Sequence, residues 1–264
     1  MKIENARVVF PLVMAMLAGC VTTDTPSSPS PSPLAADMTP DLGELWSSDW
    51  IHVTPQNGVW DDYYARTADP ANCSFDFRVM RLKEAIGVEA YVHDDKVVVD
   101  NCPAGSISCE TWKDDCLEVF FDGDGDRNPN TRGPDEAHPK ACNAGGEYAI
   151  AANGSSQSDY ASAQKCFGTL WGGTAEPWLE NGVRKGTHYR LWFRYACLGR
   201  ETPRTDEPVK FGFTVCVHDD DDGGANDLAL YWRGNPKMPY ADEGAFGTIV
   251  LPAAQAADRM KSLR

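Results

Sequence analysis

Apolar and polar residues alternate along much of the chain in short runs, and clusters of Gly, Asn, Asp and Pro separate these runs. A period of two is typical of β-strands with one buried face. No segment has the long 3.6-residue period of an amphipathic helix. The pattern predicts an all-β fold, an antiparallel β-sandwich resembling a jelly roll. Strands are expected at residues 75–82, 86–93, 116–122, 146–152, 188–197, 209–218, 227–233 and 246–251.

The run at 116–122 is the most informative of these strands. Its alternation predicts an inner face of three apolar side chains, Leu117, Val119 and Phe121. Glu118 lies on the opposite face, which Trp112 shares if the strand starts early. An aromatic plane beside a carboxylate can stack on a sugar and accept its hydroxyl protons. The alternative is a half-buried strand that ends in a solvated turn.

The first nineteen residues resemble a bacterial lipoprotein signal peptide. Lys2 and Arg7 precede an apolar run that is too short to span a bilayer comfortably, and Leu-Ala-Gly-Cys ends at Cys20. The resemblance implies cleavage before Cys20 and lipidation of this residue, which then anchors the chain in the cell envelope. Val21 rather than Asp follows the cysteine, and this favours the outer membrane.

The rest of the chain divides into a linker, one domain and a tail. Residues 20–40 are rich in Pro and Ser, so they are expected to form a solvated tether. No second linker divides residues 41–252, which are therefore assigned to a single β-sandwich domain. Residues 253–264 are expected to be a frayed tail.

Charge limits the classes of partner. The full chain has a formal net charge of −15. Removing residues 1–19 takes away two positive charges and one negative charge, which leaves the mature chain at −16. Nucleic acid and anionic lipid surfaces are thus expected to be poor partners. Neutral polysaccharides or oligosaccharides and divalent cations fit better.

The cysteines indicate an exported protein with disulfides. Of nine cysteines, eight remain when the lipidated Cys20 is set aside, and an even number favours disulfides. Four disulfides are expected, and their pairing cannot be deduced from the sequence. The chain lacks a C-x-x-C motif that would support a zinc cluster.

Acidic loops are the candidate metal sites. Asp122, Asp124 and Asp126 alternate in a glycine-containing loop, which suits calcium, although Gly133 stands where an EF-hand needs Glu. Asp94 follows an early strand and is a second candidate ligand. The run at 219–222 would be self-repelling without a cation, yet such runs are often solvated loops. An acidic turn without a cation is the alternative in each case.

Several separated motifs together resemble carbohydrate-binding module family 9, within the DOMON-like β-sandwiches. The matching pieces are residues 41–46, 87–94, 112–122, 189–195, 211–215 and 246–251. The resemblance implies a noncatalytic sandwich with structural calcium that holds a sugar between two aromatic rings. Trp112 and Tyr240 match these rings, and Glu118 matches the carboxylate that binds a hydroxyl.

One departure from that family supports a different function. Ala149 and Ala151 stand where sugar-binding members carry polar side chains, so the pocket has fewer hydrogen-bond donors. The alternative is an envelope module that binds a protein partner and has lost sugar binding. A haem-binding DOMON-like domain is a further alternative, but the chain has no C-x-x-C-H motif. The sequence also lacks the common catalytic motifs, so an enzyme is not expected.

Overall fold

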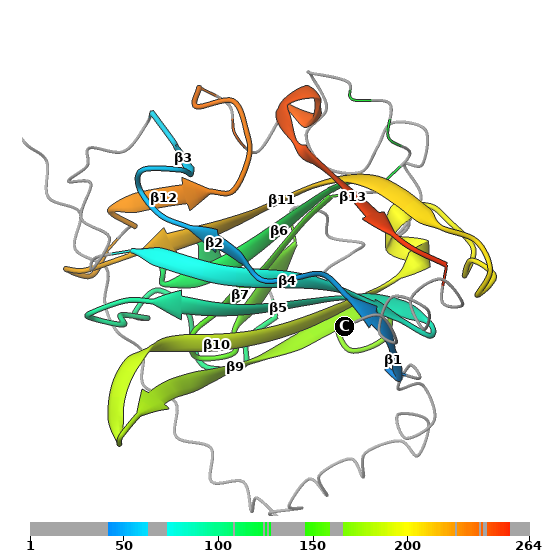
Figure 1. The fold of residues 1–264 in the computed structure, drawn as a ribbon. Helices are drawn as coiled ribbons and strands as arrows, with labels where there is room; N and C mark the ends of the chain where they lie inside the picture. Colours follow the sequence, from blue (N-terminus) through cyan, green and yellow to red (C-terminus); the bar gives the residue numbers. More distant parts are fainter. Residues whose placement is uncertain are drawn as a thin grey trace, which may run out of the picture. The chain divides into compact units, whose positions relative to one another are not determined.

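Two antiparallel sheets face each other across one core, with β4, β5, β10 and β9 in one layer and β11, β6 and β7 in the other (Figure 1). The computed structural model describes residues 42–62, 73–107, 109–123, 125, 127, 146–158, 166–224, 226–237, 239 and 242–253. Within these residues the fold is an all-β sandwich. The predicted fold class is therefore confirmed.

The first sheet has six strands in the order β1-β4-β5-β10-β9, with β2 also paired to β4. Its strands are β1 (Glu44–Ser47), β2 (Ile51–Val53), β4 (Ser74–Leu82), β5 (Ala85–His93), β9 (Trp171–Glu180) and β10 (Val183–Arg194). Strand β5 lies in the middle and pairs along its length with β4 and β10. This sheet therefore has a continuous five-strand outer surface, from β2 to β9.

The second sheet has seven strands in the order β3-β12-β11-β6-β7-β8, with β13 also paired to β11. Its strands are β3 (Val59–Trp60), β6 (Cys116–Asp122), β7 (Gly146–Ala151), β8 (Ser156–Ser158), β11 (Val209–Asp219), β12 (Leu228–Tyr231) and β13 (Gly247–Leu251). Three short 3₁₀ helices are also described, η2 (Thr111–Lys113), η3 (Tyr195–Leu198) and η4 (Glu243–Ala245).

Alternation along the strands fills the space between the sheets, as the sequence predicts. Leu117, Val119 and Phe121 of β6 all point into the main core. There Phe121 packs edge-on against Phe193 of the opposite sheet, with ring centres 4.9 Å apart. Buried aromatic pairs of this kind contribute about 1 kcal/mol beyond their buried area. Strand β6 begins and ends at the predicted residues.

Strand β9 is absent from the sequence prediction because Gly172, Gly173 and Pro177 resemble strand breakers. It forms nonetheless at the edge of the first sheet, where only one side needs hydrogen-bond donors and proline is tolerated. The short strands β1, β2, β3 and β8 were also not predicted. The other strands differ from their predicted ranges mainly at the ends.

The expectation of four disulfides is wrong. One disulfide joins Cys102 to Cys109, and Cys166 is also disulfide-bonded. Four other cysteines are buried free thiols: Cys73, Cys116, Cys197 and Cys216. Two of them, Cys73 and Cys197, belong to the main core, where a thiol packs as a small apolar side chain. An even cysteine count therefore did not mean complete pairing.

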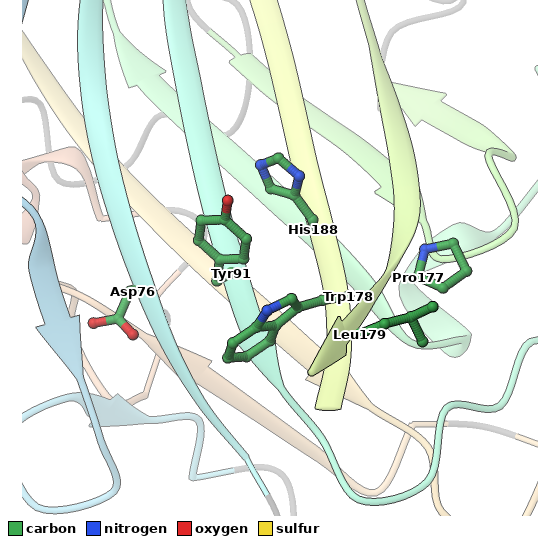
Figure 2. Close-up of a pocket in the computed structure, with 6 residues that line it drawn as sticks. All are labelled: Asp76, Tyr91, Pro177, Trp178, Leu179 and His188. Carbon is green, nitrogen blue, oxygen red and sulfur yellow. The ribbon is translucent and has the colours of Figure 1, made fainter. Parts of the chain in front are cut away.

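The two sheets differ in what their outer faces present. The first sheet carries Tyr91, Trp178 and His188 beside a surface cavity (Figure 2). On the second sheet the outward side chains of β6 are buried, and so are those of β11 apart from Lys210. Among the described residues, no helix has both the length and the apolar character needed to cross a membrane.

Candidate functional site

Trp112 lies in the 3₁₀ helix η2, immediately before β6. Its ring is partly buried, and the Lys113 ammonium nitrogen lies 5.3 Å from the ring centre. The preceding Thr111 is fully buried, and its hydroxyl lies 3.3 Å from the side-chain oxygen of Gln157 in β8. The contact from Thr111 holds η2 against the second sheet, so Trp112 borders the outer face that carries Glu118.

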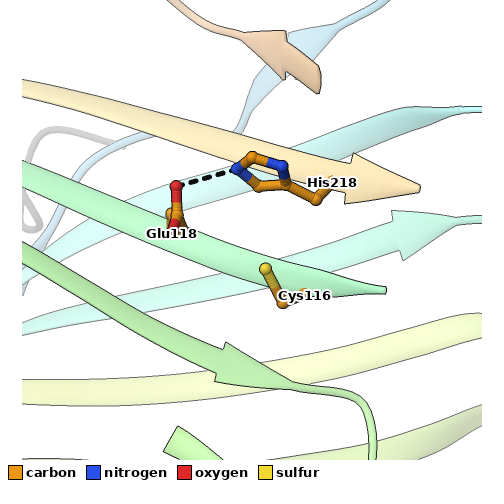
Figure 3. Close-up of side chains that lie close together, drawn as sticks. All are labelled: Cys116, Glu118 and His218. Atoms are coloured by element: carbon orange, nitrogen blue, oxygen red, sulfur yellow. Dashed lines mark hydrogen bonds and ion pairs between the residues drawn. The ribbon is translucent and has the colours of Figure 1, made fainter. Parts of the chain in front are cut away.

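Glu118 is buried on that outer face, next to Cys116 and His218 (Figure 3). In the register of β6 and β11, Cys116 is directly opposite His218. Oε2 of Glu118 lies 2.8 Å from Nε2 of His218, and Nδ1 of His218 lies 2.7 Å from the side-chain nitrogen of Asn226. An amide N–H can only donate, so Nδ1 accepts and Nε2–H donates to Glu118.

Cys116, Glu118 and His218 are neighbouring buried polar side chains. Burial raises the pKa of the Cys116 thiol well above its usual value, and the Glu118 carboxylate adds to the shift, so the thiol is neutral. One ligand atom each from Cys116, Glu118 and His218 lies within 4.8 Å of the other two, a spacing compatible with a transition metal. Oε1 of Glu118 is buried and has no hydrogen-bond partner in the described part of the chain.

Ala149 and Ala151 lie beside these side chains on β7. Ala149 is opposite Glu118, Ala151 is opposite Cys116, and both alanines are buried. Neither side chain can bind a hydroxyl. The two positions that the sequence predicted to lack polar side chains therefore lie next to Glu118 and Cys116.

A first acidic cluster joins Asp94, Asp115 and Asp219 at one end of the sandwich. One oxygen from each lies within 4.8 Å of the others, and all three residues are buried. Burial raises the pKa of Asp115 to about 9 and that of Asp219 to about 8, and the Asp94 carboxylate adds to both shifts. Burial also raises the pKa of Asp94 to about 6. Three buried carboxylates this close together repel one another, so the cluster either keeps some of them protonated or binds a cation.

A second acidic cluster, formed by Asp100, Asp114 and Asp220, lies close to the first. Oδ1 of Asp114 accepts three hydrogen bonds from Asp100 and Asn101, of 2.9–3.1 Å. Oδ1 of Asp220 accepts N–H groups of Asp222 and Gly223 at 3.2 and 2.7 Å.

The second oxygens of two of these carboxylates are unpartnered. Oδ2 of Asp114 and Oδ2 of Asp220 are buried and lack a hydrogen-bond partner among the described residues. Oxygens bound to one calcium lie within about 5 Å of each other, because each is about 2.4 Å from the ion. The 4.8 Å limit of this cluster is compatible with that geometry. Asp220 can also group with Asp222 and Asp227.

The predicted metal residues fall in different places. Asp94 belongs to the first acidic cluster, whereas Asp122 lies at the other end of β6. There it accepts the Gly125 N–H at 2.7 Å and lines a cavity with Arg127 and Lys210. Asp94 and Asp122 therefore cannot share one ion.

Several predicted positions lie outside the described residues: Cys20, Asp124, Asp126 and Tyr240. Sequence reasoning also missed functional candidates. It did not propose Asp114 or Asp115 as metal ligands, and it did not propose Tyr91 or Trp178 as binding residues. The alternation of Tyr91 with buried Ala90 and Val92 is the signal that could have identified an outward aromatic.

A family model described as "Carbohydrate family 9 binding domain-like" matches residues 43–254. No curated protein matches the chain.

Two solved structures share the fold, both of a carbohydrate binding module family 9 from Caldicellulosiruptor kristjanssonii. The structure in complex with cellotriose is 16% identical, with a TM-score of 0.51, and the match covers 74% of this chain and 82% of that one. The structure in complex with glucose is also 16% identical, with a TM-score of 0.50, and the match covers 74% and 84%.

Proposed function

Since the chain belongs to the carbohydrate family 9 binding domain-like family, we propose that it is a noncatalytic module that binds a neutral polysaccharide or oligosaccharide. The observation that carries this proposal is the match over residues 43–254, which includes the strand with Glu118 and the preceding Trp112. The solved relatives hold cellotriose and glucose, so glucose-based oligosaccharides are the first ligands to test. Affinity for one site is about millimolar to micromolar, or roughly −4 to −8 kcal/mol.

In this proposal a sugar ring stacks on Trp112, with Tyr240 as the second ring. The partly buried position of Trp112 at the edge of the second sheet supports the first contact. Glu118 is only 3% exposed, so a sugar hydroxyl has little access to its buried Oε1. Stacking on Trp112 is therefore the main contact, and Glu118 has the smaller role.

We also propose that calcium stabilises the domain at the two acidic clusters. Six carboxylates lie there at one end of the sandwich, and Asp114 and Asp220 each have a buried oxygen without a partner. The donor set is made of oxygens alone, which calcium prefers. Calcium supplies charge neutralisation and does not take part in any reaction.

The variant Asp114→Asn tests this calcium proposal. An amide can keep the three hydrogen bonds at Oδ1 while it replaces Oδ2, the oxygen without a partner, with an NH₂ group. The expected result is a weaker calcium affinity in isothermal titration, with Asp95→Asn as the control because Asp95 is exposed. Equal calcium affinity in both variants would remove Asp114 from the site.

The place of action we propose is the cell envelope, with a lipid anchor at Cys20 and the outer membrane as the destination. The signal-like segment before Cys20 and the following Val21 support this proposal. Cys20→Ser should abolish incorporation of labelled palmitate and release the protein from membranes. Unchanged labelling in this variant would disprove the anchor.

A glycan array tests the proposed function. The protein is screened with calcium and with chelator, beside Trp112→Ala. We expect binding to neutral oligosaccharides in calcium, weakened at least tenfold in Trp112→Ala at an unchanged melting temperature. A folded, calcium-loaded protein that binds none of the glycans would contradict the proposal.

A protein-binding role in the envelope is the second candidate, and one observation favours it. The buried alanines Ala149 and Ala151 leave the second sheet without polar side chains at those two positions. This role would be supported if one envelope protein copurified with the protein and the protein bound none of the glycans on the array.

A further inference from the structure

The outer face of the first sheet carries aromatic and polar side chains that the proposed function does not use. One register row crosses five strands, and its members are His52, Asp76, Tyr91, His188 and Glu176. Tyr91 and His188 stack with ring centres 4.2 Å apart and an interplanar angle of 6°. Together with Trp178 and Asp76 they line a surface cavity of about 300 Å³ (Figure 2).

Trp178 reaches this row because Gly186 leaves space for it. Gly186 of β10 is opposite Trp178 on one side and opposite His93 on the other. The rings of Trp178 and His93 are therefore in contact across the intervening strand, with centres 4.6 Å apart. Gly186 has φ +140°, and a Cβ there would lie 1.8 Å from the Val92 carbonyl oxygen, so only glycine fits.

Three large rings form a row on this face. The ring centre of Tyr91 lies 5.2 Å from that of Trp178 and 5.5 Å from that of Trp50. Trp50 is 44% exposed, and the Arg78 guanidinium lies 5.0 Å from its ring centre. We call Trp50, Tyr91 and Trp178, with His188 and Asp76, the aromatic face. Its rings offer apolar surfaces to solvent, which is unfavourable unless a ligand covers them.

Two carboxylates on this face are paired with basic groups, and the first is Glu89. Glu89 accepts hydrogen bonds from Arg78, His188 and Arg190 at 2.7, 2.9 and 3.1 Å. Burial opposes the ionisation of Glu89, but these bonds outweigh it and lower its pKa. Glu89 thereby fixes His188 against Tyr91.

Asp76 is paired in a similar way. Its two oxygens lie 2.8 Å from His52 Nδ1 and 3.0 Å from His93 Nε2. A chain with a net charge of −15 thus has a surface here whose two central carboxylates are both paired with basic groups. A neutral ligand suits such a surface better than an ion does.

From this geometry we infer that the aromatic face is a second glycan-binding site, on the sheet opposite Trp112. Its ligand is a neutral oligosaccharide whose C–H faces pack on Tyr91 and Trp178 and whose hydroxyls bind Asp76 and His188. A row of rings that runs across several strands suits an extended chain of sugars rather than one sugar. This inference rests on the proposed function for its ligand class.

Four variants of the protein test the second site: Trp178→Ala, Tyr91→Ala, Trp112→Ala and Val183→Ala. Val183→Ala is the control, because Val183 is 58% exposed at the end of the same hairpin and does not line the cavity. Each is titrated by calorimetry with cellohexaose and with the neutral glycan that the wild-type protein binds most tightly on an array. Melting temperatures show whether each variant folds.

The expected result is a loss of affinity of roughly tenfold or more in Trp178→Ala and Tyr91→Ala, with no change in Val183→Ala. Tyr91→Phe keeps the ring and should retain most of the affinity. Wild-type affinity in both Trp178→Ala and Tyr91→Ala, with binding lost in Trp112→Ala, would overturn the second site and leave the proposed function intact. A wild-type protein that binds no glycan would overturn both.

Discussion

The outer faces of the two sheets are built from similar residue types and differ in access. On the second sheet, Glu118 pairs with His218 and is only 3% exposed. On the first sheet, Glu89 pairs with His188 and is also buried, but the neighbouring Tyr91 and Trp178 are partly open to solvent. The Glu118–His218 pair thus lies on a face that is buried. The Glu89–His188 pair lies beside aromatic side chains that solvent can reach.

The proposed second site would place a glycan-binding surface on the opposite side of the same fold. The family model assigns the chain to a carbohydrate-binding family. Strand β6, whose sequence resembles that family, carries Glu118 on the buried outer face of the second sheet, here called the closed face. The rings with the best access are on the aromatic face. Variants on each face should therefore separate stability from binding.

The largest expected effect comes from the acidic end that both sheets share. Calcium at a hundredfold excess over its Kd should stabilise the fold by about 2.7 kcal/mol, which raises the melting temperature by roughly 5–10 °C in a domain of this size. Differential scanning fluorimetry with calcium and with chelator measures it. A melting temperature that is equal in both conditions would contradict calcium binding.

The same clusters predict how stability without calcium depends on pH. The folded-state pKa values of about 9 for Asp115 and about 8 for Asp219 exceed the ordinary value of 3.8. The folded state then binds more protons than the unfolded state between these limits, so stability falls as pH rises. In chelator the melting temperature should be lower at pH 8 than at pH 5.5. Calcium should reduce this difference, and a calcium benefit that shrinks at high pH would contradict the account.

On the closed face, Glu118→Ala should lower stability and have little effect on glycan binding at the aromatic face. It leaves the buried Nε2–H of His218 without its acceptor, which costs about 2 kcal/mol and lowers the melting temperature by roughly 4–8 °C. Thermal unfolding measures the loss, with Val250→Ala as the control because Val250 is 54% exposed on β13 of the same sheet. An unchanged melting temperature would mean that the Glu118–His218 pair does not support the fold.

The sequence predicts much of this fold because its strands alternate cleanly. Strand β6 matches its prediction at both ends, since Leu117, Val119 and Phe121 alternate with outward residues. Strand β9 was missed because Gly172, Gly173 and Pro177 break the local strand pattern. The strand forms because it pairs with β10, which the sequence pattern does not show. Local pattern identifies central strands better than edge strands.

The sites were less predictable, because they depend on contacts between distant segments. Asp94 was a candidate from its place after a strand, but its partners Asp115 and Asp219 become visible only when β5, β6 and β11 meet. Similarly, Trp178 and His93 touch only because Gly186 lies between them. The spacing of these residues along the chain predicts neither the acidic cluster nor the contact between Trp178 and His93.

The smallest expected effect is at the rim of the aromatic face. Trp50→Ala removes an exposed ring that contacts Tyr91 and Arg78, so the affinity for the oligosaccharide should fall by about two- to fivefold. The melting temperature should change by less than about 2 °C. Calorimetric titration beside Val183→Ala checks it. A fall as large as that of Trp178→Ala would make Trp50 a central contact rather than a rim contact.

The central claim is that a neutral glycan covers tryptophan rings of this domain. The eight tryptophans give separate indole N–H signals in a ¹⁵N-labelled protein, and single substitutions assign them. Titration with cellohexaose, or with the tightest glycan from the array, should shift the signals of Trp178 and Trp50 and leave buried Trp171 unchanged. Saturating glycan that shifts no tryptophan signal would contradict the account.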